Sequence, residues 1–271
     1  MWKRTAMRSF GILLIGGMIL FTTTCGLLTL DEALHHPPGP KVTPPPWEPP
    51  TQPYYLDELP NQLFNGSTFD SVIIVGAQEY HGPCGCAGEG DLLVARILFE
   101  GINSLNPNES LNFEDHCSTD IEYFNCTWKD VASHRNFEKI IVIGGPGVNL
   151  GWFYYNYHKP LPICFTDSQA TILVKKTGRA YCVSGFWGRE GVGSGGPVTD
   201  YAIIQLYNDE GRPVLLVAGL SGWATQLACT YLSETIASGN PPPHAYGIVL
   251  RIADENGDPL SADCEIIETV E

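Results

Sequence analysis

Ser221 stands where an apolar stretch gives way to a helical pattern. The sequence PVLLVAGLSGWATQ, from Pro213 to Gln226, predicts a strand, a tight turn carrying Ser221 and a helix. A nucleophile elbow has this layout, and His244 and Asp200 are available as partners. However, Trp223 replaces the second glycine of the elbow, and the acid precedes the serine in the chain. A helix-capping serine is therefore the favoured interpretation, and an exported serine hydrolase using Ser221 is the alternative.

A second group that could do chemistry follows the apolar run VIIVG, residues 72–76. His81, Cys84 and Cys86 form an H-x2-C-x-C trio that suits copper or zinc if the thiols stay reduced. The loop lacks the glycine spacing of a dinucleotide site. Outside the cell the two cysteines are better explained by disulfides to distant partners, so a metal or redox site here is an alternative.

An acidic turn near the C-terminus is a candidate for weak calcium binding. Asp254, Asn256, Asp258 and Glu265 fall at positions 1, 3, 5 and 12 of an EF-hand loop. Pro259 occupies the position of the invariant glycine, and predicted hairpin strands replace the flanking helices. The turn is therefore no EF-hand. An ordinary solvated turn is favoured over a weak Ca²⁺ site, and no other cofactor is predicted.

The N-terminus predicts export. Basic residues at positions 3, 4 and 8 precede an uncharged segment, residues 10–30, that is long enough to cross a membrane. The positive flank places the N-terminus in the cytoplasm and the rest outside. We therefore assign residues 1–34 to a signal sequence or membrane anchor, with retention as an anchor favoured. Lipidation of Cys25 is the alternative, although Thr22 replaces the usual aliphatic residue.

Residues 35–60 are predicted to be a proline-rich linker. Nine of the seventeen residues from Pro37 to Pro53 are proline, which favours an extended polyproline II stalk over a packed core. The whole chain has a formal net charge of -15. Such an acidic surface repels nucleic acid, so nucleic acid is excluded as a partner.

Cysteines and glycosylation sequons agree with an extracellular location. Eight cysteines follow the leader, an even number that suggests disulfides: Cys84, Cys86, Cys117, Cys126, Cys164, Cys182, Cys229 and Cys264. The pairs Cys164–Cys182 and Cys117–Cys126 are plausible because each joins residues expected to be close. N-x-S/T triplets make Asn65, Asn108 and Asn125 candidate glycosylation sites.

The remaining chain, residues 61–271, is predicted to form one α/β domain with a mixed, partly parallel sheet flanked by helices. Aliphatic runs starting at residues 71, 139 and 213 each end in glycine, as buried parallel strands do. Asp91 is a good N-cap for the helix expected after the first run, and Ser221 for the helix after the third. Stretches 170–185, 201–219 and 244–270 predict added β-hairpins. A polar, cysteine-bearing insertion at about 104–136 has no clear assignment.

Five aromatic residues crowd into the segment GWFYYNYHKPLP, residues 151–162: Trp152, Phe153, Tyr154, Tyr155 and Tyr157. Five rings in six residues seldom all fit one core, so some are candidates for contact with a partner subunit or a sugar. A loop folded over its own domain explains them about equally well.

Three segments together resemble the α/β domain of archaeal surface-layer (S-layer) proteins. They are IIVIGGPGVN, then GGPVTDYAIIQLYNDEGRPVLLVAGLSGWATQLACTYLSE, then YGIVLRIADENGDPLSADCEIIE. The resemblance covers roughly residues 70–271 through the order of its motifs. It implies an extracellular structural protein of an archaeal cell envelope with no catalytic residues. We expect such a protein to bind copies of itself, other envelope proteins or glycans. The short chain with an N-terminal anchor departs from the family and suggests an accessory surface protein.

Overall fold

The structure is a computed structural model that describes residues 43–49, 53–65, 68–79, 87, 89–105, 111–125, 139–166, 170–185, 187 and 196–271. Residues Pro40–Glu271 make one compact unit. The predicted anchor, residues 1–34, lies outside the described residues, as do His81, Cys84, Cys86, Asn108 and Cys126. Within the described residues, no helix is both long and apolar enough to cross a membrane.

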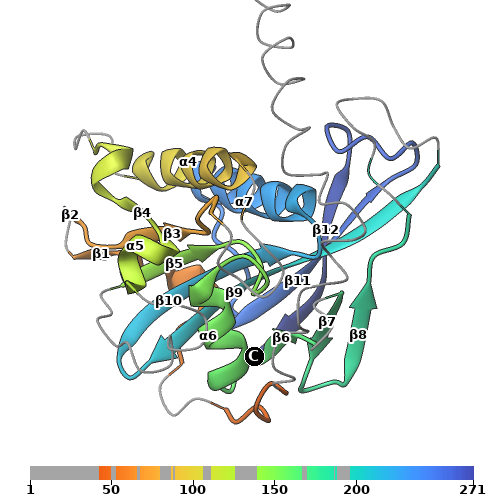
Figure 1. Cartoon of the computed structure of the whole chain (residues 1–271), viewed down its shortest axis with the longest axis horizontal. Helices are drawn as coiled ribbons and strands as arrows, with labels where there is room; N and C mark the ends of the chain where they lie inside the picture. Colours follow the sequence, from red (N-terminus) through yellow and green to blue (C-terminus); the bar gives the residue numbers. More distant parts are fainter. Residues whose placement is uncertain are drawn as a thin grey trace, which may run out of the picture. The chain divides into compact units, whose positions relative to one another are not determined.

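A seven-stranded mixed sheet organises the domain, in the order β12-β11-β9-β10-β5-β3-β4 (Figure 1). Its strands are β3 (Val72–Val75), β4 (Cys117–Thr119), β5 (Ile140–Ile143), β9 (Val198–Asp209), β10 (Arg212–Gly219), β11 (Gly247–Asp254) and β12 (Asp263–Val270). The neighbours β4, β3, β5 and β10 run parallel, whereas β9, β11 and β12 are joined by antiparallel pairings. The predicted α/β class, the three parallel strands and the hairpins at 201–219 and 244–270 are thus confirmed.

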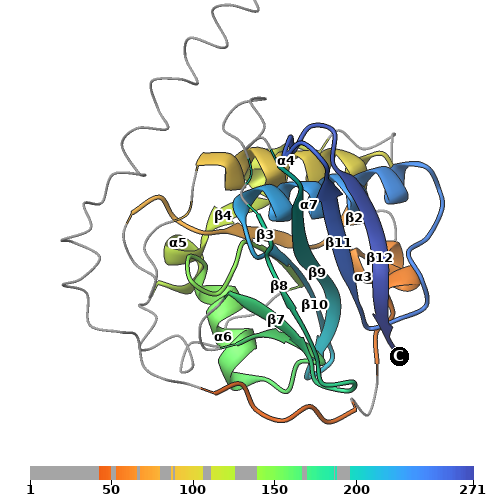
Figure 2. The same ribbon diagram turned by 90° about the vertical axis from the view of Figure 1, so that its right-hand side faces the viewer.

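Alternating side chains of the strands build two cores, one on each face of the sheet. In β5, Ile141 and Ile143 pack on one face while Ile140 and Val142 pack on the other, and all four are fully buried. Helices α4 (Glu89–Asn103) and α7 (Gly222–Ala237) cover the first face. The helices α5 (Asp120–Phe124) and α6 (Leu150–His158) lie on the second face, as Figure 2 shows. Burial on both faces explains why these strands are continuous aliphatic runs.

A separate three-stranded sheet adds to the second face. It contains β6 (Ile163–Phe165), β7 (Thr171–Val174) and β8 (Arg179–Cys182), in that order. The hairpin predicted at 170–185 therefore exists, but it does not extend the main sheet as expected. A β-bridge between Ser184 and Thr199 and a hydrogen bond from Nε2 of Gln205 to the carbonyl of Ile163, at 3.0 Å, connect it to β9. The remaining elements are short: η1 (Leu56–Glu58), α3 (Leu59–Leu63), β1 (Phe64–Asn65), β2 (Thr68–Phe69) and η2 (Phe113–Asp115).

The aromatic segment is the helix α6, and its rings pack within their own domain, which was one of the two interpretations left open, although the segment is a helix rather than a loop. Asn149 caps the helix, and the side chains of Trp152, Phe153, Tyr154, Tyr155 and Tyr157 are all at most 7% exposed. Trp152 even donates from Nε1 to the carbonyl of Val217 in β10, at 3.2 Å. The rings fit one core because α6 lies between the main sheet and the small sheet, and both contribute to that core.

The compact domain begins before residue 61, which corrects the predicted end of the linker. Leu56 and Leu59 are fully buried in the core beneath α4 and α7. The backbone N–H of Leu56 donates to the carbonyl of Ala245, at 2.8 Å. Apolar side chains at these two positions supply the burial that the prolines before them cannot. Residues Pro44–Trp47 also lie against the domain, where they line a cavity with β6 and β7.

Helices α4 and α7 approach closely at Gly101, so this position tolerates no larger side chain. A Cβ added to Gly101 would lie 2.7 Å from the Cα of Ser233, which no side-chain rotation relieves. We expect Gly101→Ala to lower the free energy of unfolding by about 1 to 3 kcal/mol, because overpacking forces the helices apart. Urea unfolding followed by circular dichroism measures this change.

The same helix provides the control. A Cβ on Gly90 would meet nothing within 4 Å. Gly90→Ala should therefore leave stability unchanged or raise it by up to about 1 kcal/mol through helix propensity. Equal destabilisation by both substitutions would show that the α4–α7 contact is not the cause.

Candidate functional site

The carboxyl ends of β3 and β5 form a topological switch point. After β3 the chain passes to β4 on one side, and it then returns to β5 on the other side of β3. Open α/β sheets bind ligands outside the strand ends at such a point, because the loops diverge there. The residues that gather at this edge are therefore the first candidates for a functional site.

Asp120 is the centre of this edge. Its side chain is fully buried at the start of α5. One carboxylate oxygen accepts from the backbone N–H groups of Ala77, at 2.8 Å, and Ile121, at 2.9 Å. The other accepts from the N–H of Leu150, at 2.7 Å. Asp120 thus joins the loop after β3 to the first residues of α5 and α6.

Asn149 performs a similar task at the end of β5. Its side-chain amide donates to the carbonyls of Ile74, at 3.2 Å, and Ile143, at 2.9 Å. Its side-chain oxygen accepts from the N–H groups of Gly151 and Trp152, which caps α6. The fully used amide explains why an asparagine follows the glycine-rich GGPGV turn in this sequence.

Asp91 is the titratable group at this edge with a pKa near neutrality. It lies in the first turn of α4, two residues inside the helix, and is therefore not the N-cap that the sequence predicted. Burial raises the pKa of its carboxyl group to about 6, and the charge of Asp120 adds to this effect. A Cβ on Gly144, after β5, would lie 3.3 Å from Oδ2 of Asp91. Asp91 can therefore gain or lose a proton close to the switch point.

This raised pKa predicts how Asp91 affects stability. The folded carboxyl group holds its proton up to about pH 6, whereas the ordinary value is 3.8. The folded state therefore binds more protons between these values, and stability falls as the pH rises through that window. Asp91→Asn should raise the free energy of unfolding by up to about 3 kcal/mol at pH 7 and change it little at pH 3. Urea unfolding at both pH values tests this, and an equal effect at both would contradict it.

Ser221 is a helix cap hydrogen-bonded to a buried acid. Its Oγ accepts from the N–H of Ala224, at 3.1 Å, and donates to Oδ2 of Asp200, at 2.5 Å. Asp200 is fully buried and also accepts from Nε1 of Trp187, at 2.8 Å. The capping role favoured by the sequence is therefore confirmed, and the neighbouring acid is the one that the sequence offered.

His244 does not join Ser221. Its ring stacks on Tyr55, with centroids 3.8 Å apart, and its Nδ1 lies 3.1 Å from the carboxylate of Asp57. The strand that follows it, β11, pairs with β9 so that Gly247 faces Gln205 while Ile252 faces Asp200. His244 thus lies at the opposite end of the sheet from Ser221. The three residues proposed for a hydrolase are not brought together.

In the predicted calcium turn, the protein's own donors occupy Asp254. Its carboxylate accepts from the N–H groups of Asn256, at 2.7 Å, and Asp258, at 2.9 Å, and from Oγ of Ser261, at 2.8 Å. These bonds, that from Asp258 above all, lower the pKa of Asp254. Glu265 faces Arg251 instead, at 3.4 Å. Within the described residues, no three His, Cys, Asp or Glu side chains are arranged to hold a metal ion. Weak calcium binding stays a prediction.

The predicted Cys164–Cys182 disulfide is wrong. The two residues lie on β6 and β8, and β7 separates these strands. Two strand spacings come to about 10 Å, which exceeds the reach of a disulfide. Among the described residues, Cys117, Cys182, Cys229 and Cys264 form no disulfide with one another, and the pair Cys117–Cys126 stays a prediction because Cys126 lies outside them. Burial raises the pKa of Cys117 and of Cys264 to about 11, so both stay protonated at neutral pH and are poor metal ligands.

Two of the candidate glycosylation sites are on the surface. Asn65 ends β1 and Asn125 follows α5, and both are exposed. Asn125 adopts the left-handed conformation, with φ of 47°, as the C-cap of α5. A glycan could be attached at either residue without unfolding the described core.

Sequence reasoning missed Asp120, although its carboxylate accepts three backbone hydrogen bonds at the switch point. It follows β4, a three-residue strand of the polar sequence Cys-Ser-Thr, inside the insertion that had no assignment. Its only sequence signal is the capping box from Thr119 to Glu122, which marks the start of α5.

Comparison of the chain with protein-family models, curated proteins and solved structures finds no match.

Proposed function

We propose that this chain is a membrane-tethered structural protein of the cell surface, S-layer-like or S-layer-associated, that acts through assembly and surface interaction. The basic flank and uncharged segment of the leader support export and anchoring. The exposed sequons at Asn65 and Asn125 suit an extracellular glycoprotein. The S-layer resemblance of residues 70–271 supports the structural role.

One structural observation carries this proposal. At the edge where an α/β enzyme would bind its substrate, Asp120 and Asn149 use their side chains to hold the protein's own backbone. Ser221, a short distance along the same edge, uses its hydroxyl to cap α7. These groups stiffen the domain, which benefits a building block that must transmit force and keep its shape.

Immunogold labelling of the folded domain on native cell envelopes tests the proposal. Gold at a regular repeat on intact cells is expected for a lattice component, and scattered surface gold for an accessory protein. Gold that appears only after the cells are permeabilised would contradict a surface location altogether. The labelled epitope should lie on β11–β12, away from both exposed sequons, so that glycans do not block the antibody.

A serine hydrolase is the second candidate, and one observation favours it. The hydroxyl of Ser221 donates to the carboxylate of Asp200, at 2.5 Å, and stands at the N-terminus of α7. A carboxylate alone is a weak base for a serine, and the histidine that would complete a triad lies elsewhere. The structural role is therefore preferred.

The two candidates predict different results for Ser221→Ala. As a cap, Ser221 contributes about 1 kcal/mol or more, so the substitution should lower stability by that amount. A serine-reactive fluorophosphonate should label neither the wild-type chain nor the variant. Labelling of the wild type that disappears in Ser221→Ala would instead establish the hydrolase. The third alternative, a metal or redox site at His81, Cys84 and Cys86, predicts free thiols at both cysteines in non-reduced mass mapping.

A further inference from the structure

A cavity of about 500 Å³ lies between the proline segment and the small sheet. One wall consists of Pro44, Pro45 and Trp47, and the other comes from β6, β7 and the turn after β7. Figure 2 shows this segment, in orange-red, running below α6 and the β7–β8 hairpin. The volume falls within the range of small-molecule sites, which are mostly apolar with a few placed polar groups.

Lys175 supplies the charge of this cavity. Among the described residues that line it, Lys175 is the only charged one. The ammonium group donates to the carbonyl of Pro45, and its three N–H donors leave further bonds available. Burial lowers the pKa of Lys175, since the cavity walls replace water around the ammonium group. An anion in the cavity would offset this desolvation.

Trp47 supplies an apolar wall. Its Nε1 is fully buried, so the ring rather than the N–H is available to a ligand in the cavity. Sugars and aromatic ligands both pack on such a ring.

We propose that this cavity binds a small organic carboxylate, with the ammonium group of Lys175 facing its oxygens and the ring of Trp47 packing on its body. A carboxylate offers two acceptor oxygens, and a charge-assisted hydrogen bond from an ammonium group is roughly twice as strong as a neutral one. The prolines and Leu173 hold the body of the ligand. The body can be a sugar ring or an aromatic ring, and the chemistry common to both is the carboxylate.

Calorimetric titration of the full-length chain with benzoate and, separately, with glucuronate tests this site. At least one of them is expected to bind with a dissociation constant of about 1 mM or tighter. The ligand that binds more tightly indicates the uncharged part of the natural ligand. Tighter binding of benzoate indicates an aromatic acid, and tighter binding of glucuronate indicates a sugar acid. Benzamide, which keeps the ring but has no charge, should bind at least about tenfold more weakly than benzoate.

Variants assign the binding to Lys175 and to the ring of Trp47. Lys175→Met should weaken binding at least about tenfold, and Lys175→Arg, which keeps the charge, should retain most of it. Trp47→Ala removes the apolar wall of the cavity, so it should weaken binding several-fold. Lys176→Met is the matched control, because Lys176 is the exposed neighbour and donates to the carbonyl of Glu271.

Several results would overturn the proposal. They are the failure of both carboxylates to bind, equal binding of benzamide, and binding that Lys175→Met leaves intact. If Lys175→Met does not fold, Lys175→Gln takes its place and must show the same loss. Loss of binding in Lys176→Met to the same extent would also place the ligand elsewhere. None of these results bears on the cell-surface location, which the immunogold experiment tests separately.

Discussion

Asp120→Ala is expected to lower the free energy of unfolding by about 4 kcal/mol or more. The substitution removes the acceptor of three backbone N–H groups, those of Ala77, Ile121 and Leu150. A buried donor left without an acceptor costs about 1 to 3 kcal/mol, and here three lose their acceptor together. Because they belong to the loop after β3 and to the first turns of α5 and α6, the switch point should loosen as a unit. Urea unfolding measures the change in stability, and hydrogen exchange of these three amides localises it.

Asp120→Asn separates the charge of this residue from its shape. The amide keeps one oxygen as an acceptor, but its NH₂ group then faces an N–H donor, so we expect a smaller loss of stability. It should also lower the pKa of Asp91, because the charge of Asp120 is one of the two causes that raise it. An NMR titration of the Asp91 carboxyl group measures this. A stability loss below about 1 kcal/mol in Asp120→Ala would show that water replaces the carboxylate. Asp120 would then not be what holds the loop after β3 to α5 and α6.

The sequence was sufficient for the elements with strong hydrophobic patterns. β3, β5 and β10 are buried on both faces, so their sequences are unbroken aliphatic runs that end where glycine permits a sharp turn. The hairpins of β9–β10 and β11–β12 carry Gly-containing turns, in which Gly211 has φ of 91° and Gly257 has φ of 70°. Local chemistry decides such elements, and a single sequence contains it.

Elements whose form depends on distant contacts were missed. β4 is a polar edge strand of three residues, and only its pairing with β3 makes it a strand. The helix α6 is buried on all sides, so its aromatic residues show no polar face that would mark a helix. The core around α6 includes residues of β6 and β7, which follow later in the chain. Nothing within residues 150–158 indicates that contact.

In the candidate site, too, local features were predictable from the sequence and long-range contacts were not. The capping role of Ser221 was predictable, because strand, turn and helix are consecutive in the chain. The meeting of Asp91 and Asp120 was not, since the two lie 29 residues apart and only the position of β4 beside β3 brings them together. Likewise, His244 and Ser221 are 23 residues apart but lie at opposite ends of the sheet. Sequence proximity therefore suggested a triad that the topology forbids.

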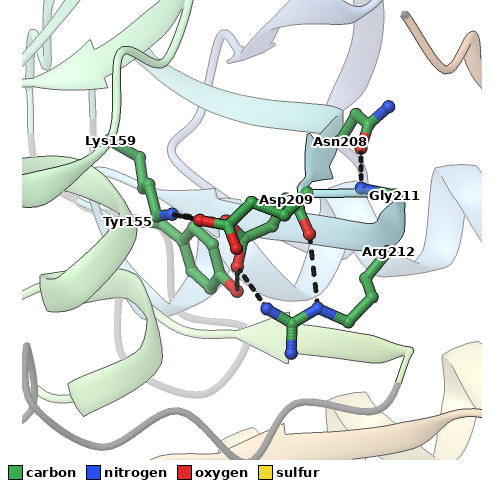
Figure 3. Close-up of polar contacts among 7 residues, drawn as sticks. Tyr155, Lys159, Asn208, Asp209, Gly211 and Arg212 are labelled. Carbon is green, nitrogen blue, oxygen red and sulfur yellow. Dashed lines mark hydrogen bonds and ion pairs between the residues drawn. The ribbon is translucent and has the colours of Figure 1, made fainter.

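Asp209→Ala is expected to lower the free energy of unfolding by about 3 to 5 kcal/mol, because it breaks a buried ion cluster. Asp209 is 1% exposed at the end of β9. As Figure 3 shows, its carboxylate forms ion pairs with Lys159, at 2.5 Å, and Arg212, at 3.3 Å. It also accepts a hydrogen bond from the hydroxyl of Tyr155, at 3.2 Å. The cluster joins the C-terminal end of α6 to the β9–β10 turn.

The pKa values of the partners show how strongly Asp209 holds them. Burial alone would lower the pKa of Lys159, but its hydrogen bond and charge attraction to Asp209 raise it overall. Burial raises the pKa of Tyr155 well above its usual value, and the charge of Asp209 adds to this. Removing Asp209 therefore leaves a half-buried cation without its buried counter-charge, and this makes the loss large.

A double-mutant cycle decides whether the pair or the packing matters. If the pair is responsible, Lys159→Met should cancel part of the loss in Asp209→Ala, with a coupling energy of about 1 to 3 kcal/mol. Glu210→Gln is the matched control, since Glu210 is 62% exposed and lies 3.8 Å from the same lysine. Such a surface pair should contribute less than about 1 kcal/mol. Additive effects of the Asp209 and Lys159 substitutions would show that the two charges stabilise the domain independently, and the cluster would then not be what fixes α6 to the sheet.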